Sequence, residues 1–263
     1  MDYQTILVEE KNAVGYLTLN RPKQLNSFNE AMHKEVSSVL KAWSKDSSIR
    51  AVVLSAEGRG FCAGQDLGDR VVDPNADSPD LGLSIETYYN PLIKLITTMP
   101  KPVICAVNGV AAGAGANIAL ACDLVLAAKS ASFIQAFCRL GLVPDSGGTW
   151  FLPRVVGRAR AMGLAMLGDK LSAEQALAWG MIWQVFEDDA LRSEAVTLAE
   201  HLASQPTYGL SLIKKAINVS ADNSLEDQLI LERDLQRLAG RSADYKEGVQ
   251  AFMQKRTPTY QGR

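Results

Sequence analysis

Two glycine-rich segments have the composition of loops that approach a ligand closely. The first runs from Gly58 to Leu67 and the second from Asn108 to Asn117, each shortly after an apolar run. The second continues into an alanine- and leucine-rich helical pattern. A glycine turn that opens a helix presents unpaired N–H groups and the positive end of the helix dipole. The second segment therefore suits a phosphate or a developing oxyanion, whereas the first, taken alone, is equally compatible with a plain turn.

Asp145 is the one acid in an apolar neighbourhood that extends from Leu124 to Leu152. A carboxyl group in such surroundings can serve as a general acid or base, and burial raises the pKa of an aspartate. The run from Pro144 to Gly148 can instead simply cap a helix that begins near Ser146. Composition alone favours the capping interpretation and leaves catalysis open.

Other catalytic and binding patterns fit the sequence poorly. The spacing Gly113-x-Gly115-x-x-Ile118 lacks the third small residue of a dinucleotide-binding loop, and no acid follows where the ribose-binding residue would stand. The four cysteines, at 62, 105, 122 and 138, show no metal-binding spacing, and the chain has only two histidines. We expect reduced, buried thiols, with His33 and His201 on the surface and no metal site.

The elements that position these segments alternate between strand and helix patterns. Gly15 to Asn20 and two short apolar runs, 51–54 and 103–107, have the composition of buried strands. From Asn29 onward, apolar residues recur at helical spacing as far as Trp43. The repeat predicts an α/β fold with parallel strands covered by helices.

The second half of the chain is predicted to be mainly helical. Ser172 and Gln175 have the spacing of a capping box for a helix that ends at Gly180, and 181–186 has the pattern of a last strand. Helical patterns then follow, listed by range: 190–204, 207–219, 225–239 and 242–254.

In the first half, 68–83 is rich in Asp, Pro and Gly and is predicted to be a functional surface loop. Tyr88-Tyr89, at the start of a helical stretch, is typical of core packing.

Composition narrows the class of protein further. The chain has 263 residues, of which 47% are hydrophobic and 21% charged, with a net charge of -2. These values are typical of a globular enzyme, and they disfavour a general nucleic-acid-binding surface. The first residues lack a signal-peptide pattern, and the long apolar stretch from Pro102 to Leu126 is interrupted by Asn108, glycines and Asp123. We expect a cytoplasmic protein with no membrane contact.

Taken together, these segments resemble the crotonase (enoyl-CoA hydratase/isomerase) superfamily. The resemblance covers essentially the whole chain, from Asn20-Arg-Pro-Lys-Gln-Leu-Asn-Ser-Phe28 through both glycine loops to Ala251-Phe-Met-Gln-Lys-Arg256. It implies a crotonase-like spiral of ββα turns over 1–195, which holds an acyl-CoA site, and a helical C-terminal trimerisation region over 196–263. The implied assembly is a homotrimer or a dimer of trimers.

The resemblance also implies the residues of the site. Two backbone N–H groups, those of Gln65 and Ala114, would hold the thioester oxygen. The implied contacts of the substrate and its CoA come from the N-terminal motif, the first glycine loop, the hydratase glutamate positions and the C-terminus: Arg21, Lys23, Leu25, Ala63, Asp66, Leu67, Asn117, Phe137, Phe252 and Lys255.

Departures from the hydratase pattern indicate the reaction. The two water-activating glutamates of hydratases fall on Asn117 and Phe137, so the chain lacks both carboxylates. Asp145 stands at the position that carries the working carboxylate of some isomerases and of aryl-CoA dehalogenases. The dehalogenase pattern also needs a Trp at Phe137 and a His near Asn90, and neither is present. The resemblance thus makes Asp145 the expected acid and base, in apolar surroundings made by four residues: Phe137, Leu142, Val143 and Trp150.

The longer strings 58–71, 146–166 and 235–249 resemble one isomerase subfamily in particular. Its members convert the ring 1,2-epoxide of phenylacetyl-CoA into the oxepin thioester and also shift Δ3 double bonds to Δ2. Such a reaction needs no cofactor apart from the CoA of the substrate, and association with a related pathway hydratase is a further expectation. Two alternatives stay open: a general Δ3,Δ2-enoyl-CoA isomerase of fatty acyl chains, and a non-catalytic CoA-binding subunit.

Overall fold

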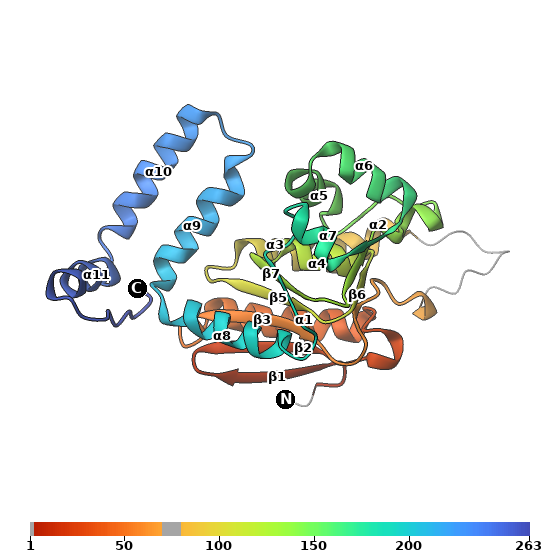
Figure 1. Cartoon of the computed structure of the whole chain (residues 1–263), viewed down its shortest axis with the longest axis horizontal. Helices are drawn as coiled ribbons and strands as arrows, with labels where there is room; N and C mark the ends of the chain where they lie inside the picture. Colours follow the sequence, from red (N-terminus) through yellow and green to blue (C-terminus); the bar gives the residue numbers. More distant parts are fainter. Residues whose placement is uncertain (1–2, 70–79) are drawn as a thin grey trace.

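Two sheets form the core of the computed structural model, which describes residues 3–69 and 80–263, and helices cover them (Figure 1). The larger sheet has the strand order β1-β2-β3-β5-β7-β10, in which β1 and β2 are antiparallel and the other neighbours parallel. Its strands are β1 (Ile6–Lys11), β2 (Val14–Leu19), β3 (Ala51–Ala56), β5 (Val103–Val107), β7 (Leu124–Ala128) and β10 (Gln184–Phe186).

The smaller sheet has the order β4-β6-β8-β9, and β9 alone is antiparallel to its neighbour. Its strands are β4 (Gly60–Cys62), β6 (Val110–Ala112), β8 (Ser132–Ile134) and β9 (Lys170–Ser172). The chain alternates between the sheets, because β3 is followed by β4, β5 by β6, and β7 by β8. Helices separate these pairs, so each turn of the spiral is a ββα unit. The predicted α/β class and spiral are confirmed.

Helices α1 (Glu30–Lys45), α3 (Asn90–Thr98) and α8 (Leu191–Ser204) contribute buried side chains to the core. The Asn29 side chain caps α1 by accepting a hydrogen bond of 2.9 Å from Met32 N. The apolar stripe of α1 that the periodicity predicts, from Met32 to Trp43, is buried. Helix α8 contacts β2, β3, β5, β7 and β10 and so covers one face of the larger sheet.

The remaining helical elements lie around the two sheets or form the C-terminal part of the chain. Around the two sheets they are η1 (Pro22–Gln24), η2 (Leu67–Asp69), α2 (Leu81–Ser84), the π-helical turn η3 (Ile85–Tyr89), α4 (Ala114–Ala121), η4 (Ala136–Leu140), α5 (Gly148–Val156), α6 (Arg158–Leu167) and α7 (Ala173–Ala178). The C-terminal helices are α9 (Thr207–Ser220), α10 (Leu225–Ala239) and α11 (Ala243–Gln254).

The C-terminal helices α9, α10 and α11 extend away from the sheets as an arm (Figure 1). Arg50 fastens its base, since its guanidinium donates to Thr207 Oγ1 at 2.9 Å, Tyr260 O at 2.9 Å and Gln205 O. The boundary expected at 195–196 lies inside α8, and the division into a core and a helical region remains a prediction.

Several local expectations can be compared with the structure. Ser172 caps α7 by accepting from Gln175 N, as predicted, whereas the last strand covers only 184–186 of the expected 181–186. The loop prediction for 68–83 lies largely outside the described residues. The prediction of a surface position for His33 is wrong, because the residue is 4% exposed and its ring lies between Tyr88, Tyr89 and Phe28.

Candidate active site

The two glycine loops are in direct contact. A methyl group on Gly64 would lie 3.1 Å from Ala112 O and 3.3 Å from Ala114 N. A methyl group on Gly115 would lie 2.3 Å from Cys62 O. The absence of side chains at these two glycines therefore lets the first turn of α4 pack directly against β4 and the residues that follow it.

The N–H groups of Gln65 and Ala114 are available to an acceptor. Phe28 N donates to Gly64 O at 2.7 Å and Asp66 N donates to Phe28 O at 2.9 Å, which leaves the Gln65 N–H on the side away from Phe28. Ala114 is the first residue of α4, where backbone N–H groups have no partner within the helix. Gly113, with φ +55°, sets this entry into the helix. In the described ranges, neither N–H donates to another protein group.

Asp145 lies in a loop between η4 and α5 and is half-buried. Its Oδ1 accepts a hydrogen bond of 2.9 Å from Ser146 Oγ, and its backbone oxygen accepts from Gly148 N at 2.9 Å and Asn117 Nδ2 at 2.8 Å. Ser146 and Gly147 both have positive φ values, +53° and +78°. The loop thus turns sharply directly after the carboxylate.

The expected apolar surroundings of Asp145 are only partly present. Phe137 is buried, but Val143 is 76% exposed, and Leu142 and Trp150 are also classed among the exposed large apolar residues. The prediction of an apolar enclosure is wrong for these three residues in the single chain, because all three are exposed to solvent.

Residues expected near the CoA come together around the first glycine loop. Arg21 NH2 lies 2.8 Å from Asp66 Oδ2 in an ion pair whose side chains are each 16% exposed. Ala63 N donates to Leu25 O at 2.9 Å. Burial acts to raise the pKa of Asp66, but hydrogen bonds from Arg21 and Gly68 N outweigh it and lower the pKa below its usual value.

Four further predicted residues divide into two groups. Lys23, in η1, is exposed, and so is Leu67, which ends this loop and begins η2. Phe252 and Lys255 lie at the end of α11, which Figure 1 places on the opposite side of the molecule from α4 and β6. One chain therefore does not bring these two residues to the glycine loops.

Asn117 and Phe137 are the residues expected at the positions of the two hydratase glutamates. The Phe137 ring packs beside Gly113, since a methyl group there would lie 3.7 Å from its Cζ. Asn117 is fully buried on the first turn of α4, and its Oδ1 accepts from Gln135 Nε2 at 2.8 Å.

Sequence reasoning missed the roles of Tyr89 and Gln135. Tyr89 is a core residue, as its position predicted, but its hydroxyl also donates to Gln65 Oε1 at 3.0 Å. It ends a π-helical turn, a feature that is frequent near functional sites and has no clear sequence signal. Gln135 gave no signal either, because a glutamine between a strand and a short helix is typical of a surface residue.

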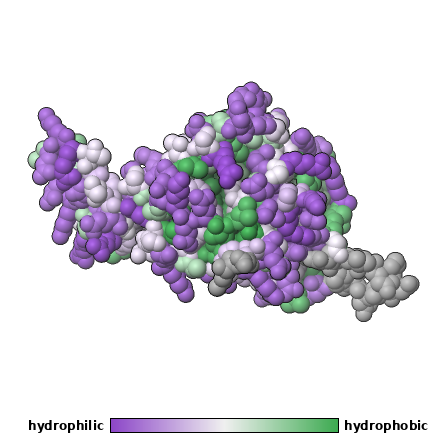
Figure 2. Space-filling model, turned by 90° about the horizontal axis from the view of Figure 1, so that it is seen from below, coloured by the Kyte–Doolittle hydropathy of each residue, from purple (hydrophilic) through white to green (hydrophobic). Residues whose placement is uncertain are grey.

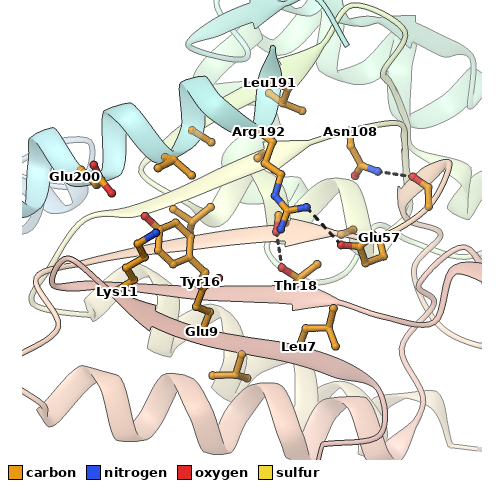
Figure 3. A pocket seen from close by; sticks show the side chains of 18 of the residues that line it. Leu7, Glu9, Lys11, Tyr16, Thr18, Glu57, Asn108, Leu191, Arg192 and Glu200 are labelled. Atoms are coloured by element: carbon orange, nitrogen blue, oxygen red, sulfur yellow. Dashed lines mark hydrogen bonds and ion pairs between the residues drawn. The ribbon is translucent and has the colours of Figure 1, made fainter. Parts of the chain in front are cut away.

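A separate cavity of about 500 Å³ lies between α8 and strands β1, β2 and β3 (Figure 3). Tyr16, Glu57, Arg192 and Glu200 are among its lining residues, and it includes none of the site residues predicted from the sequence. Figure 2 shows that apolar side chains also gather in a hollow on the face seen from below.

Within 3–69 and 80–263, no cluster of His, Cys, Asp or Glu suited to a metal ion is present. Over the same residues, the structure contains no helix of the length and hydrophobicity that a bilayer span requires.

Comparison with known proteins extends these observations. The profile of the enoyl-CoA hydratase/isomerase family matches residues 9–263. The chain is 61% identical to the 1,2-epoxyphenylacetyl-CoA isomerase of Escherichia coli, over 98% of each protein. It is 34% identical to the trans-2-decenoyl-[acyl-carrier-protein] isomerase of Streptococcus mutans over the full length of both. The solved structure of an enoyl-CoA hydratase from Bacillus anthracis superposes with a TM-score of 0.93 at 33% identity, over 99% of this chain and 100% of that one.

Proposed function

The chain belongs to the enoyl-CoA hydratase/isomerase family, and from that premise we propose that it isomerises 1,2-epoxyphenylacetyl-CoA to the oxepin thioester. The near full-length identity of 61% to an enzyme with that substrate carries the proposal. The site agrees with an isomerase, because Asn117 and Phe137 stand where hydratases hold their two glutamates. Asp145 is then the acid and base.

In the proposed mechanism, the Gln65 and Ala114 N–H groups donate to the thioester oxygen. Fixed donors at a helix N-terminus stabilise the negative charge that develops there, so the C2 protons become more acidic. For a 3-enoyl-CoA, the Asp145 carboxylate removes a proton from C2 and returns it to C4, and the double bond moves into conjugation. The epoxide rearrangement likewise conserves all atoms, and the overall oxidation state does not change. Neither reaction therefore requires a redox cofactor.

The CoA moiety is proposed to bind along the first glycine loop. Arg21 and Lys23 supply positive charge for its phosphates, and Leu25, Ala63, Asp66 and Leu67 line the path beside them. Phe137 and Asn117 stand on the acyl side, next to Gly113 and Asp145. We also propose a cytoplasmic location.

The arm is proposed to build a homotrimer. Its helices expose large apolar side chains, among them Ile217, Leu225, Phe252 and Met253 at 66% to 82% exposure. A surface of this kind is typical of an association site. Phe252 and Lys255 would then reach the CoA bound to a neighbouring subunit. Light scattering during gel filtration measures the mass, and a monomer at micromolar concentration would contradict this assembly. Association with a pathway hydratase is tested by co-purification.

Turnover of freshly generated 1,2-epoxyphenylacetyl-CoA tests the function, with wild type and Asp145→Asn side by side. We expect oxepin-CoA, identified by mass and ultraviolet spectra, from the wild type, and a rate lower by about 10²–10⁴ in the variant with CoA binding retained. A wild type that isomerises only straight-chain 3-enoyl-CoA would be a general enoyl isomerase. A wild type inactive on both substrates would be a binding subunit.

A further inference from the structure

We propose that Asn117 is a positioning residue, which fixes the catalytic aspartate relative to the oxyanion donors without itself reacting with substrate. The inference rests on the proposed function of Asp145. It gives the buried amide pair Asn117–Gln135 a role in catalysis, although neither side chain is an acid or a base.

A hydrogen bond from Asn117 connects the first turn of α4 to the loop that carries Asp145. Asn117 lies three residues after Ala114 on α4, so both are on the same turn. Its Nδ2 donates to the backbone oxygen of Asp145 at 2.8 Å. The N–H that is proposed to bind the thioester oxygen and the carboxylate that moves the proton are therefore connected through a single rigid element.

The Asp145 loop needs such an anchor because its backbone is strained. Ser146 has φ +53°, a conformation that costs a non-glycine residue on the order of 1 kcal/mol. The Gly148 backbone also approaches the amide so closely that a methyl group on Gly148 would lie 2.3 Å from Asn117 Nδ2. The hydrogen bond and the close packing together hold Asp145 in one place.

Gln135 holds the other end of the Asn117 amide. Its Nε2 donates to Asn117 Oδ1 at 2.8 Å, and both side chains are buried, at 4% and 0% exposure. Because the Asp145 backbone oxygen can only accept, the amide must present its NH₂ group to it. The Asn117 oxygen then faces Gln135, whose donor satisfies it, so both ends of the Asn117 amide are hydrogen-bonded.

The amide pair is proposed to set the position of Asp145 and not to contact substrate. Removal of either amide should therefore lower kcat and leave substrate binding unchanged. A displacement of a catalytic group by about 1 Å can lower a rate about 10²-fold. We expect Asn117→Leu to lower kcat by about that factor with KM nearly unchanged. Gln135→Met, which removes the donor at similar volume, should lower kcat by a smaller factor. Asn218→Leu is the matched control, since it also removes an amide-to-carbonyl hydrogen bond, from Asn218 Nδ2 to Thr97 O, but lies on α9.

The first measurement is a double-mutant cycle on isomerisation and on deuterium exchange at C2 of phenylacetyl-CoA. If Asn117 acts only through Asp145, Asn117→Leu should cause no additional loss in an Asp145→Asn background. A raised KM with unchanged kcat, or losses that simply multiply, would overturn the positioning role and indicate direct contact with substrate.

The second measurement does not depend on turnover. Hydrogen exchange of the peptide covering 141–150 in the intact protein should be faster in Asn117→Leu than in wild type, while the strands of the larger sheet keep their protection. Unchanged exchange in this peptide would refute the anchor whatever the activity. Faster exchange in a protein whose wild type catalyses neither reaction would refute the proposed function and leave the anchor standing.

Discussion

Gly115→Ala is expected to separate the two oxyanion donors. The added methyl group would lie 2.3 Å from Cys62 O and 2.7 Å from Cys62 Cβ, whereas ordinary contact begins near 3.4 Å. Because Cys62 belongs to β4 and is fully buried, the first turn of α4 must retreat by about 1 Å. Ala114, the residue before Gly115, moves with it.

Two opposing energies decide the effect on stability. Alanine is a better helix former than glycine by about 1 kcal/mol, which favours the variant. Insertion of a methyl group into a close-packed site costs about 1–3 kcal/mol, and here the obstacle is backbone, which cannot rotate away. We therefore expect a net loss of about 1 kcal/mol in the free energy of unfolding, with the larger effect on activity.

The expected loss in kcat/KM is about 10²-fold, the usual consequence of a 1 Å misplacement or of one lost oxyanion donor. The assay is isomerisation of a 3-enoyl-CoA, with urea unfolding measured in parallel. Gly163→Ala is the matched control, because Gly163 lies inside α6 and a methyl group there meets nothing within 4 Å. This control should gain about 0.5–1 kcal/mol and keep full activity.

Two outcomes would contradict this prediction. A Gly115→Ala enzyme with wild-type kcat/KM would mean that the two glycine loops are not in the contact described, or that the Ala114 N–H does not bind the thioester oxygen. A loss of activity that matched the fraction of unfolded protein would also contradict the prediction.

Two further predictions concern titratable groups. Three cysteines are buried and Cys138 is half-buried, and burial also raises the pKa of Cys62 to about 12. A thiol reagent at pH 8 should therefore label Cys138 first and the other three thiols only on unfolding. Rapid labelling of more than one thiol would contradict this. The pKa of Asp66 is lowered, so the stabilisation from its pair with Arg21 is complete above the usual Asp pKa of about 3.9 and is lost as pH falls through the lower folded value. Asp66→Asn should therefore lower the free energy of unfolding by about 1 kcal/mol at pH 7, and the difference should shrink only below about pH 4; a difference that begins to shrink near pH 6 would assign it to another group.

The local parts of this protein could be predicted from its amino-acid sequence. Apolar runs at strand length and a continuous stripe on α1 predicted the α/β core, because burial of an apolar face depends on residues close together in the chain. Gly113 and Gly115 indicated a helix N-terminus that approaches another segment, since only glycine tolerates that backbone and that contact. Asp145 could be singled out because it is the one acid in an apolar stretch of the sequence, where a charged side chain is unusual.

Which of these parts contact one another became visible from the folded chain. A surface position is predicted for His33, yet Phe28 and two tyrosines of the π-helical turn, Tyr88 and Tyr89, bury it. Gln135 and Tyr89 touch Asn117 and Gln65 across 18 and 24 positions of sequence, through single hydrogen bonds. Such contacts leave no periodic trace, because hydrophobic patterning reports the face that a residue occupies and not the side chain that it meets there. The position of Phe252 and Lys255 on a projecting arm likewise depends on how α9 leaves the sheet, which no local propensity encodes.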